Sequence, residues 1–419
     1  MGNHIAKLTR RIRETPTLPV EIVLTIIARA DPVTVVRCAA ASKLLRRHIA
    51  DPAFHAEVGA AGRGRGGAYD PSLLLGIFQQ HRDGEPYRFV PVPPSRARLT
   101  LPLMPAGDAL PNSFEPVASR GGLVVLRRRQ RVGGPVELCV CSPVAGRRSL
   151  IILPPLSLDY YDSHVLLPGD EDDDSSSSTG RRHFSFRLLV VEVLCQTQTF
   201  SSRTGAWGPV TEVAGGDGYW PVRPTAVVLR GVAHWLCRRD HVPPRGSSEE
   251  FFTYRVVSLR VDTTGAPQLA GAAIEVPQCC LRRRYRYPAA VPRSKELLLV
   301  STAEGRLGLL VAEIMAISIW VVPSGEDDSW GARRVVVDKA AMLRSVELRW
   351  ELHICVTVEM EWFGEASGAV VLQVHGAGVL VLDLRTGGVV QLSLHLHKPL
   401  RCCPYEAGLL PLLASISSA

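Results

Sequence analysis

Two histidines near the end of the chain have the spacing of a metal pair. His395 and His397 alternate along an expected strand, so both would project from the same face. A structural zinc site needs four ligands, and the sequence indicates no third one. We therefore expect ordinary strand histidines and no metal site.

The ten cysteines lack the spacing of a zinc or redox site. No two of them form a C-x-x-C motif, and no histidines follow at the spacing of a zinc module. Cys139 and Cys141 would lie on one face of a strand as buried thiols. This usage indicates a reducing compartment, so we expect the protein in the cytoplasm, the nucleus or both.

The motifs of common enzyme classes do not occur in the sequence. There is no G-x-S-x-G and no Walker loop, and Gly215, Gly216 and Gly218 precede Trp220 in a turn without a following helix. No acid and base pair stands out among the carboxylates. We expect a protein that is not an enzyme and has no cofactor, so that any chemistry belongs to its partners.

Four short helical patterns lie between residues 15 and 58. Apolar residues recur three and four positions apart, beginning with Ile22 and Ile26, and Asp31 with Pro32 ends the first pattern. Pro19 suits an opening turn. Helices this short, with apolar residues on more than one face, predict a small bundle that needs a partner.

This segment resembles an F-box. The matching residues are Leu18, Pro19, Ile22, Ile26, Arg29, Asp31, Pro32, Val35, Arg37, Cys38, Ser42, Lys43, Leu45, Ile49, Asp51, Pro52 and Phe54. The resemblance implies docking on a Skp-type adaptor of a cullin-RING ubiquitin ligase. The implied adaptor contacts are Leu18, Pro19, Ile22, Ile26, Val35, Cys38 and Leu45. Many F-boxes carry Trp where this chain has Leu45. The alternative is a helical cap on the rest of the chain.

The net charge of +8 is concentrated at the start of the chain. Residues 1–65 hold 11 Lys and Arg against 5 Asp and Glu, a balance of +6, so the other 354 residues carry only +2. A basic excess placed there could steer the segment toward an acidic partner surface.

A repeat of about sixty residues follows a Gly-rich linker at 59–70. In each unit a strand pattern leads into a polar turn that ends in glycine, and a second strand pattern follows. These glycines are Gly84, Gly146, Gly205, Gly265, Gly325 and Gly387, separated by 62, 59, 60, 60 and 62 residues. Such regularity in an all-β region predicts a β-propeller of about six blades, with each turn closing an outer hairpin. A pair of two-sheet sandwiches is the alternative.

The β region also resembles the kelch-like, F-box-associated propeller of a large plant F-box family. The matching stretches are R-G-G-L-V-V-L at 120–126, G-V-A-H-W at 231–235, W-F-G-E-A-S-G at 362–368 and C-P-Y-E at 403–406. We therefore expect an α+β multidomain chain: a tail at 1–14, an F-box at 15–58, a linker at 59–70 and a propeller at 71–419. The acidic and serine-rich run 169–180 predicts a disordered loop.

The connections between the repeats are expected on the rim opposite the glycine turns, at 94–120, 155–184, 214–224, 277–294 and 338–350. Arg, Tyr and Trp dominate binding hot spots, and we expect these residues to bind a protein substrate. The predicted substrate residues are Tyr160, Tyr161, Tyr219, Trp220, Arg282, Arg283, Arg284, Tyr285, Tyr287 and Trp350. Some of these aromatic residues could instead cover blade edges.

Together these features predict a substrate-recognition subunit of an SCF-type ubiquitin ligase. The first alternative is an interaction scaffold without a ligase. The second is a binder of single-stranded nucleic acid, suggested by the arginine clusters at 127–131 and 282–287. No membrane partner is expected, because the apolar run 307–322 is shorter than a bilayer span and contains Glu313. Two buried strands explain that run better.

Overall fold

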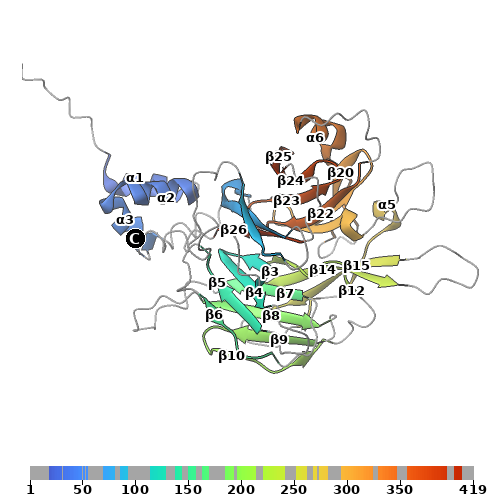
Figure 1. The fold of residues 1–419 in the computed structure, drawn as a ribbon, viewed down its shortest axis with the longest axis horizontal. Helices are drawn as coiled ribbons and strands as arrows, with labels where there is room; N and C mark the ends of the chain where they lie inside the picture. The colour runs from blue at the N-terminus through green and yellow to red at the C-terminus, as the bar shows by residue number, and fades with distance from the viewer. Residues whose placement is uncertain are drawn as a thin grey trace, which may run out of the picture.

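The fold is seen in a computed structural model of the chain (Figure 1). It describes residues 18–30, 32–49, 51, 53–54, 69–80, 85–92, 114–128, 137–143, 150–156, 163–168, 185–192, 196–213, 220–240, 252–261, 268–270, 273–281, 294–323, 329–346, 356–393 and 401–407.

Three short helices form the N-terminal segment. They are α1 (Val20–Ala28), α2 (Pro32–Ala41) and α3 (Lys43–Ile49). Helix α1 begins after Pro19 with Glu21 in its first turn, where a negative charge favours the helix dipole. Helix α2 begins with a proline, which suits the first helical position. Three of the four predicted helical patterns are confirmed as helices, and most of the fourth lies outside the described residues. The identity of the segment as an F-box stays a prediction.

Six antiparallel sheets follow the helices, and we number them as blades 1 to 6. Blade 1 contains β26 (Arg401–Glu406), β1 (Leu74–Gln80) and β2 (Arg88–Pro91). Blade 2 contains β3 (Phe114–Arg120), β4 (Leu123–Arg128), β5 (Glu137–Cys141) and β6 (Ile151–Ile152). Blade 3 contains β7 (Ser163–Pro168), β8 (Phe186–Glu192), β9 (Gln196–Ser201), β10 (Ala206–Trp207) and β11 (Thr211–Glu212).

The second half of the ring has the same construction. Blade 4 contains β12 (Trp220–Pro221), β13 (Val227–Leu229), β14 (Val232–Asp240), β15 (Phe252–Arg260), β16 (Gln268–Leu269) and β17 (Ile274–Glu275). Blade 5 contains β18 (Leu297–Ser301), β19 (Leu307–Ala312), β20 (Ala316–Val321) and β21 (Arg334–Asp338). Blade 6 contains β22 (Val358–Phe363), β23 (Ala369–Val374), β24 (Gly378–Asp383) and β25 (Val389–Ser393). The predicted six-bladed β-propeller is therefore confirmed.

Short helical turns complete the described part of the propeller. They are η1 (Pro71–Leu73), α5 (Gln278–Leu281), η4 (Ser294–Glu296) and α6 (Lys339–Ser345). Asp70 caps η1, and Asp338 caps α6 through a hydrogen bond from Ala341 N to its Oδ1 of 2.8 Å. No helix within the described ranges has both the length and the hydropathy to cross a bilayer.

The ring is closed by strands from its two ends. Strand β26, from the C-terminal end, pairs with β1, and this places β26 innermost in blade 1, beside the inner strands β3 and β22 of the neighbouring blades. Blade 1 is therefore held together only when both ends of the β region are present.

The central strands are apolar because blades pack face to face. Every residue of β19 and β23 is buried, so neither strand alternates between apolar and polar residues. The apolar run 307–322 forms β19 and β20, which confirms that it is a pair of buried strands. Cys139 and Cys141 are also buried as predicted, between blades 1 and 2.

Two of the six predicted glycine turns lie within the described residues. Gly205 lies between β9 and β10 and Gly387 between β24 and β25, the outer two strands of their blades, as predicted. Their φ values of 66° and 70° are in the region that favours glycine. Gly84, Gly146, Gly265 and Gly325 lie outside the described residues.

Three of the predicted connections contain inner strands, and range 214–224 is one of them because it contains β12. Range 155–184 contains the inner strand β7, so the acidic run 169–180 separates β7 from β8 and does not link two blades. The acidic run itself lies outside the described residues. Range 94–120 likewise contains β3.

We call the end of the ring that carries the β22–β23 loop and Gly387 the turn rim, and the opposite end the connection rim. Tyr69 and Asp70 are the first described residues after the helical segment, and both contact the blades. The Tyr69 hydroxyl donates to the carbonyl oxygen of Ser301 in blade 5, and Asp70 N donates to Ala366 O in blade 6 over 2.9 Å. The helical segment is thus connected to the propeller at the turn rim.

Candidate functional site

The helical segment has its own closed interior. Six of its side chains are at most 5% exposed: Ile27, Ala28, Val35, Ala39, Ile49 and Phe54. Local hydrogen bonds position α3, because Ser42 caps its first turn and Arg46 Nε donates to Ala39 O over 3.2 Å. The interior therefore does not need the remaining apolar residues of α1.

Those remaining residues form an apolar stripe on the outside of the segment. Leu18, Ile22 and Ile26 follow one another at intervals of four residues and are 60%, 47% and 56% exposed. Leu44 on α3 is 56% exposed as well. Burying one such side chain contributes about 1.5–3 kcal/mol, so contiguous exposed apolar residues of this kind mark an interaction surface.

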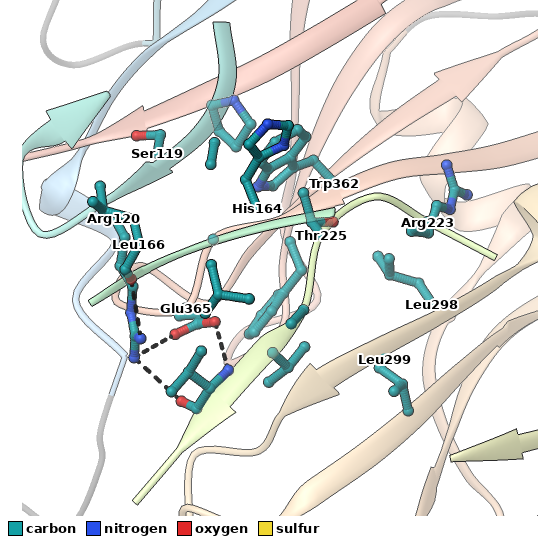
Figure 2. A pocket seen from close by; sticks show the side chains of 18 of the residues that line it. Ser119, Arg120, His164, Leu166, Arg223, Thr225, Leu298, Leu299, Trp362 and Glu365 are labelled. Carbon is teal, nitrogen blue, oxygen red and sulfur yellow. Dashed lines mark hydrogen bonds and ion pairs between the residues drawn. The ribbon is translucent and has the colours of Figure 1, made fainter. Parts of the chain in front are cut away.

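A second candidate site is the cavity on the propeller axis. Its walls come from the inner strands of all six blades, and Figure 2 shows Arg120, His164, Arg223, Trp362 and Glu365 among the lining residues. The cavity has a volume of about 60 Å³, room for about two water molecules. Drug-sized ligands use pockets of roughly 300–1,000 Å³, so recognition of a protein would fall on the rims and not inside the channel.

Arg120 and Glu365 form an ion pair across this axis. Arg120 Nη2 lies 2.9 Å from Glu365 Oε2 and also donates to Val228 O over 3.3 Å (Figure 2). Val228 N in turn donates to Glu365 Oε1 over 2.8 Å. Burial raises the pKa of Glu365, and the charge of Arg120 opposes this increase. The pair connects blades 2, 4 and 6 at the turn rim.

Glu406, on the innermost strand of blade 1, connects this blade to blades 6 and 2 at the same rim. Its carboxylate accepts hydrogen bonds from Ser367 N at 2.7 Å and Ala366 N at 3.1 Å, while its carbonyl accepts from Gly122 N at 3.1 Å. A Cβ at Gly364 would lie 2.3 Å from the Glu406 carboxylate, so a larger residue there would displace this carboxylate.

These contacts explain the four sequence stretches that resemble the plant propeller family. Arg120 and Gly122 belong to the first, Glu365 to the third and Glu406 to the fourth. Trp235, from the second, donates from Nε1 to Ser163 Oγ over 2.8 Å and links blades 4 and 3. All four stretches make contacts between blades, so they act in packing the ring.

His164 is buried in the wall of the axial cavity, and His234 on β14 is half-buried. Burial lowers the pKa of His164 to about 3, with the charge of Arg127 adding to the effect. Burial also lowers the pKa of His234 to about 4, and its Nδ1 lies 2.7 Å from Ser258 Oγ. Both imidazoles are neutral near pH 7.

Charged residues also meet on the side of the axis toward the connection rim. Arg223 Nη1 lies 3.6 Å from Glu361, and Lys295 Nζ lies 2.8 Å from Glu361 and 3.3 Å from Glu359. Two positive and two negative side chains balance, so this group ties blades 4, 5 and 6 together without a net charge.

A sequence family covers most of the chain. The model of a domain of unknown function, DUF7595, matches residues 94–416. The chain belongs to the DUF7595 family. Both the helical segment and strands β1 and β2 lie outside the matched range, although β1 closes the ring of this DUF7595 propeller.

Other comparisons add only distant likenesses. No curated protein matches the DUF7595 chain in sequence. A mutant Aleuria aurantia lectin in complex with Fucα1-6GlcNAc is 11% identical with a TM-score of 0.32, covering 67% of this chain and 79% of the lectin. A glycosyl hydrolase from Bacteroides ovatus is 12% identical with a TM-score of 0.30, covering 77% and 98%. A prolyl endopeptidase is 10% identical with a TM-score of 0.26, covering 66% and 35%.

The adaptor residues expected for the DUF7595 chain divide into two groups. Leu18, Pro19, Ile22 and Ile26 are exposed on one face. Val35 is 1% exposed inside the segment, and Cys38 and Leu45 are half-buried against the same interior. Leu44 on α3, also exposed, was not among the expected adaptor residues.

Trp220 is the one predicted substrate residue that lies within the described residues. Trp220 is 51% exposed at the start of the inner strand of blade 4. Met315, in the β19–β20 turn at the same rim, is 57% exposed and was not predicted. The other predicted substrate residues lie outside the described residues: Tyr160, Tyr161, Tyr219, Arg282, Arg283, Arg284, Tyr285, Tyr287 and Trp350.

Of the two arginine clusters, only part of 127–131 is described. Arg127 pairs with Glu115 at 2.5 Å and Arg128 with Glu137 at 2.9 Å, and Glu115 is shared with Arg401. In the part of the chain that the structure describes, no group of three or more His, Cys, Asp or Glu residues could hold a metal ion. His395 and His397 lie outside that part.

Proposed function

We propose that this protein is the substrate-recognition subunit of an SCF-type, cullin-RING ubiquitin ligase. The helical segment binds a Skp-type adaptor, and the propeller binds the protein to be ubiquitinated. The protein is not itself an enzyme, because the covalent chemistry takes place at the ubiquitin-loaded conjugating enzyme. The observation that carries the proposal is the exposed apolar stripe Leu18, Ile22 and Ile26 on a segment whose interior is already closed.

The stripe supports docking by a specific physical argument. A helical cap on the propeller would bury its apolar face against the blades, whereas Leu18, Ile22 and Ile26 are exposed in the presence of the propeller. An apolar partner groove that receives residues spaced four apart would remove this surface from water.

The propeller supports the second half of the proposal. Its axial cavity of about 60 Å³ is too small for a peptide segment, so a target would bind on a rim. We propose the connection rim, where Trp220 is exposed and to which the sequence pattern assigned the other predicted substrate residues. It lies opposite the rim connected to the helices. Holding a target there converts the encounter between its lysine and the ubiquitin thioester into a local one.

Co-purification with a Skp-type adaptor tests this function. We expect the wild-type chain to retain the adaptor and the double variant Leu18→Glu with Ile22→Glu to lose it, because charged residues cannot enter an apolar groove. Ile152→Glu is the matched control, since Ile152 is 67% exposed on the propeller. If the wild-type chain does not co-purify with the adaptor, the ligase function is contradicted, and an interaction scaffold without a ligase becomes the function to test.

A further inference from the structure

Lysine is rare in this chain although basic residues are common. Of the 48 Lys and Arg residues only five are lysines, and none occurs between Lys43 and Lys295. The complete set is Lys7, Lys43, Lys295, Lys339 and Lys398. Asparagine is also rare, with two residues, so the low lysine count alone does not carry an inference. The inference rests instead on where the lysines lie in the propeller.

The chemical difference between the two basic residues concerns nucleophilic attack. In ubiquitin transfer the neutral ε-amine of lysine attacks the thioester carbonyl carbon, the C–S bond breaks, the conjugating enzyme's thiolate leaves, and the nitrogen loses a proton as the isopeptide bond forms. An arginine guanidinium stays protonated throughout the physiological pH range and does not react in this way. Arginine supplies the same positive charge without an acceptor amine.

Lys295 is held in an ion-pair network. Its Nζ lies 2.8 Å from Glu361 Oε1 and 3.3 Å from Glu359 Oε2, and its side chain is 38% exposed. Burial lowers the pKa of Lys295, but the hydrogen bond and charge of Glu361 and Glu359 outweigh this and hold the pKa above its ordinary value. The ammonium form, which cannot attack, is favoured.

Lys339 is shielded by burial. It is 7% exposed at the start of α6, and its backbone N donates to Met315 O over 2.8 Å. Lys43, in contrast, is exposed on the helical segment. Lys7 and Lys398 lie outside the described residues. The described propeller surface therefore exposes arginine side chains, as at Arg88 and Arg385. Of its two lysines, Lys295 is ion-paired and Lys339 is buried.

We propose that the propeller is protected against ubiquitin transfer to itself, by arginine in place of lysine on its surface and by the pairing of Lys295 and burial of Lys339. This inference rests on the proposed ligase function. A receptor holds its own surface near the thioester for as long as it holds a target, so the scarcity of acceptor amines directs transfer to the target.

The first test measures amine accessibility without a ligase. The full-length native chain is treated briefly with an N-hydroxysuccinimide acetate, and peptide mass spectrometry follows each lysine. We expect Lys295 and Lys339 to react at least about 10-fold more slowly than Lys43, because Lys295 is held in its ion pairs and Lys339 becomes accessible only through local opening. The urea-unfolded chain is the control, in which all three react at similar rates. Native rates within twofold of Lys43 would overturn the inference.

The second test introduces amines in the reconstituted ligase. Arg88→Lys and Arg385→Lys preserve charge at exposed positions, and Arg385→Gln is the matched control without an amine. We expect ubiquitin on the introduced amines, with at least about 10-fold less on Lys295 and Lys339. Equal transfer to Lys295 or Lys339, or none to the introduced amines, would overturn the inference while leaving adaptor binding intact. A wild-type chain that does not bind the adaptor would overturn the ligase function and this inference together.

Discussion

At the scale of single residues, the Arg120–Glu365 pair holds the ring at its axis. Arg120 contacts the carbonyl oxygens of Leu166 and Val228 as well as Glu365, so one side chain from blade 2 reaches blades 3, 4 and 6. Its removal would leave a carboxylate in a cavity wall without its positive partner.

We predict that Arg120→Met lowers the free energy of unfolding by about 2 kcal/mol, less than the cost of breaking a fully buried pair because both side chains are partly exposed. Arg128→Met is the control, since Arg128 and Glu137 form an exposed pair at the same distance of 2.9 Å. Urea denaturation measures both. Equal effects of the two substitutions would show that the axial pair has no special role.

A second residue-scale prediction concerns pH. Folding holds the pKa of His164 at about 3, below its ordinary value of 6.5, so the unfolded chain binds the proton first as the pH falls. Stability is therefore full above pH 6.5 and falls below it. We predict that the wild type loses about 2 kcal/mol more than His164→Gln between pH 7 and pH 5 in urea denaturation. Parallel pH profiles for the two proteins would contradict the burial of a neutral imidazole.

A comparison of alanine substitutions at Gly368 and Gly376 distinguishes the effect of packing from that of backbone strain. Gly368 and Gly376 have φ values of 69° and 84°, but a Cβ at Gly368 would lie 2.2 Å from the Tyr69 ring, whereas a Cβ at Gly376 meets nothing within 4 Å. We predict a loss of about 1 kcal/mol for Gly376→Ala and about 2 kcal/mol more for Gly368→Ala. Thermal unfolding compares them. Similar losses would mean that Tyr69 does not pack against the β22–β23 loop.

At the scale of elements, the chain ends decide the stability of the ring. Strand β26 is the inner strand of blade 1 and contacts β3 and β22, so the ring opens without it. We predict that removing residues 401–419 abolishes cooperative unfolding of the propeller, measured by circular dichroism. Removing residues 1–54 should preserve it, because the helical segment has a separate interior. A cooperative transition in the chain lacking 401–419 would refute closure by β26.

The element scale also shows what the sequence could predict. A turn such as Gly387 depends on local chemistry: a positive φ, with Thr386 Oγ1 donating to Asp383 over 2.9 Å. The sixty-residue period therefore predicted six blades. Contacts such as Tyr405 Oη with Gly122 O, 283 residues apart, depend on closure and have no local signal. For the same reason the axial ion pair was not predicted.

The prediction of the candidate sites was limited in the same way, because the sequence shows local periodicity but not the contacts between elements. The period of four places Ile22 and Ile26 on one face of α1, with Leu18 just before the helix, without knowledge of any neighbour. Whether Val35 faces outward depends on how α2 packs against α1 and α3, and the structure places it inside. Periodicity identified the apolar residues, but packing decided which of them remain exposed.

At the scale of the whole molecule, the chain separates two surfaces. The helical segment carries an apolar stripe and joins the propeller at the turn rim, through Tyr69 and Asp70. Trp220 and Met315 are exposed at the opposite rim. This separation suits a protein that binds an adaptor and a target at once, which is the central claim.

The affinity for a Skp-type adaptor, measured by isothermal titration calorimetry, tests this claim most directly. We predict one-to-one binding by the wild-type chain and a Kd at least about 100-fold higher for Ile26→Glu, since losing a buried Ile and burying a charge together exceed about 2.7 kcal/mol. The Kd of Ile152→Glu, altered on the propeller, should match the wild type. No binding by the wild type, or an unchanged Kd for Ile26→Glu, would contradict the account.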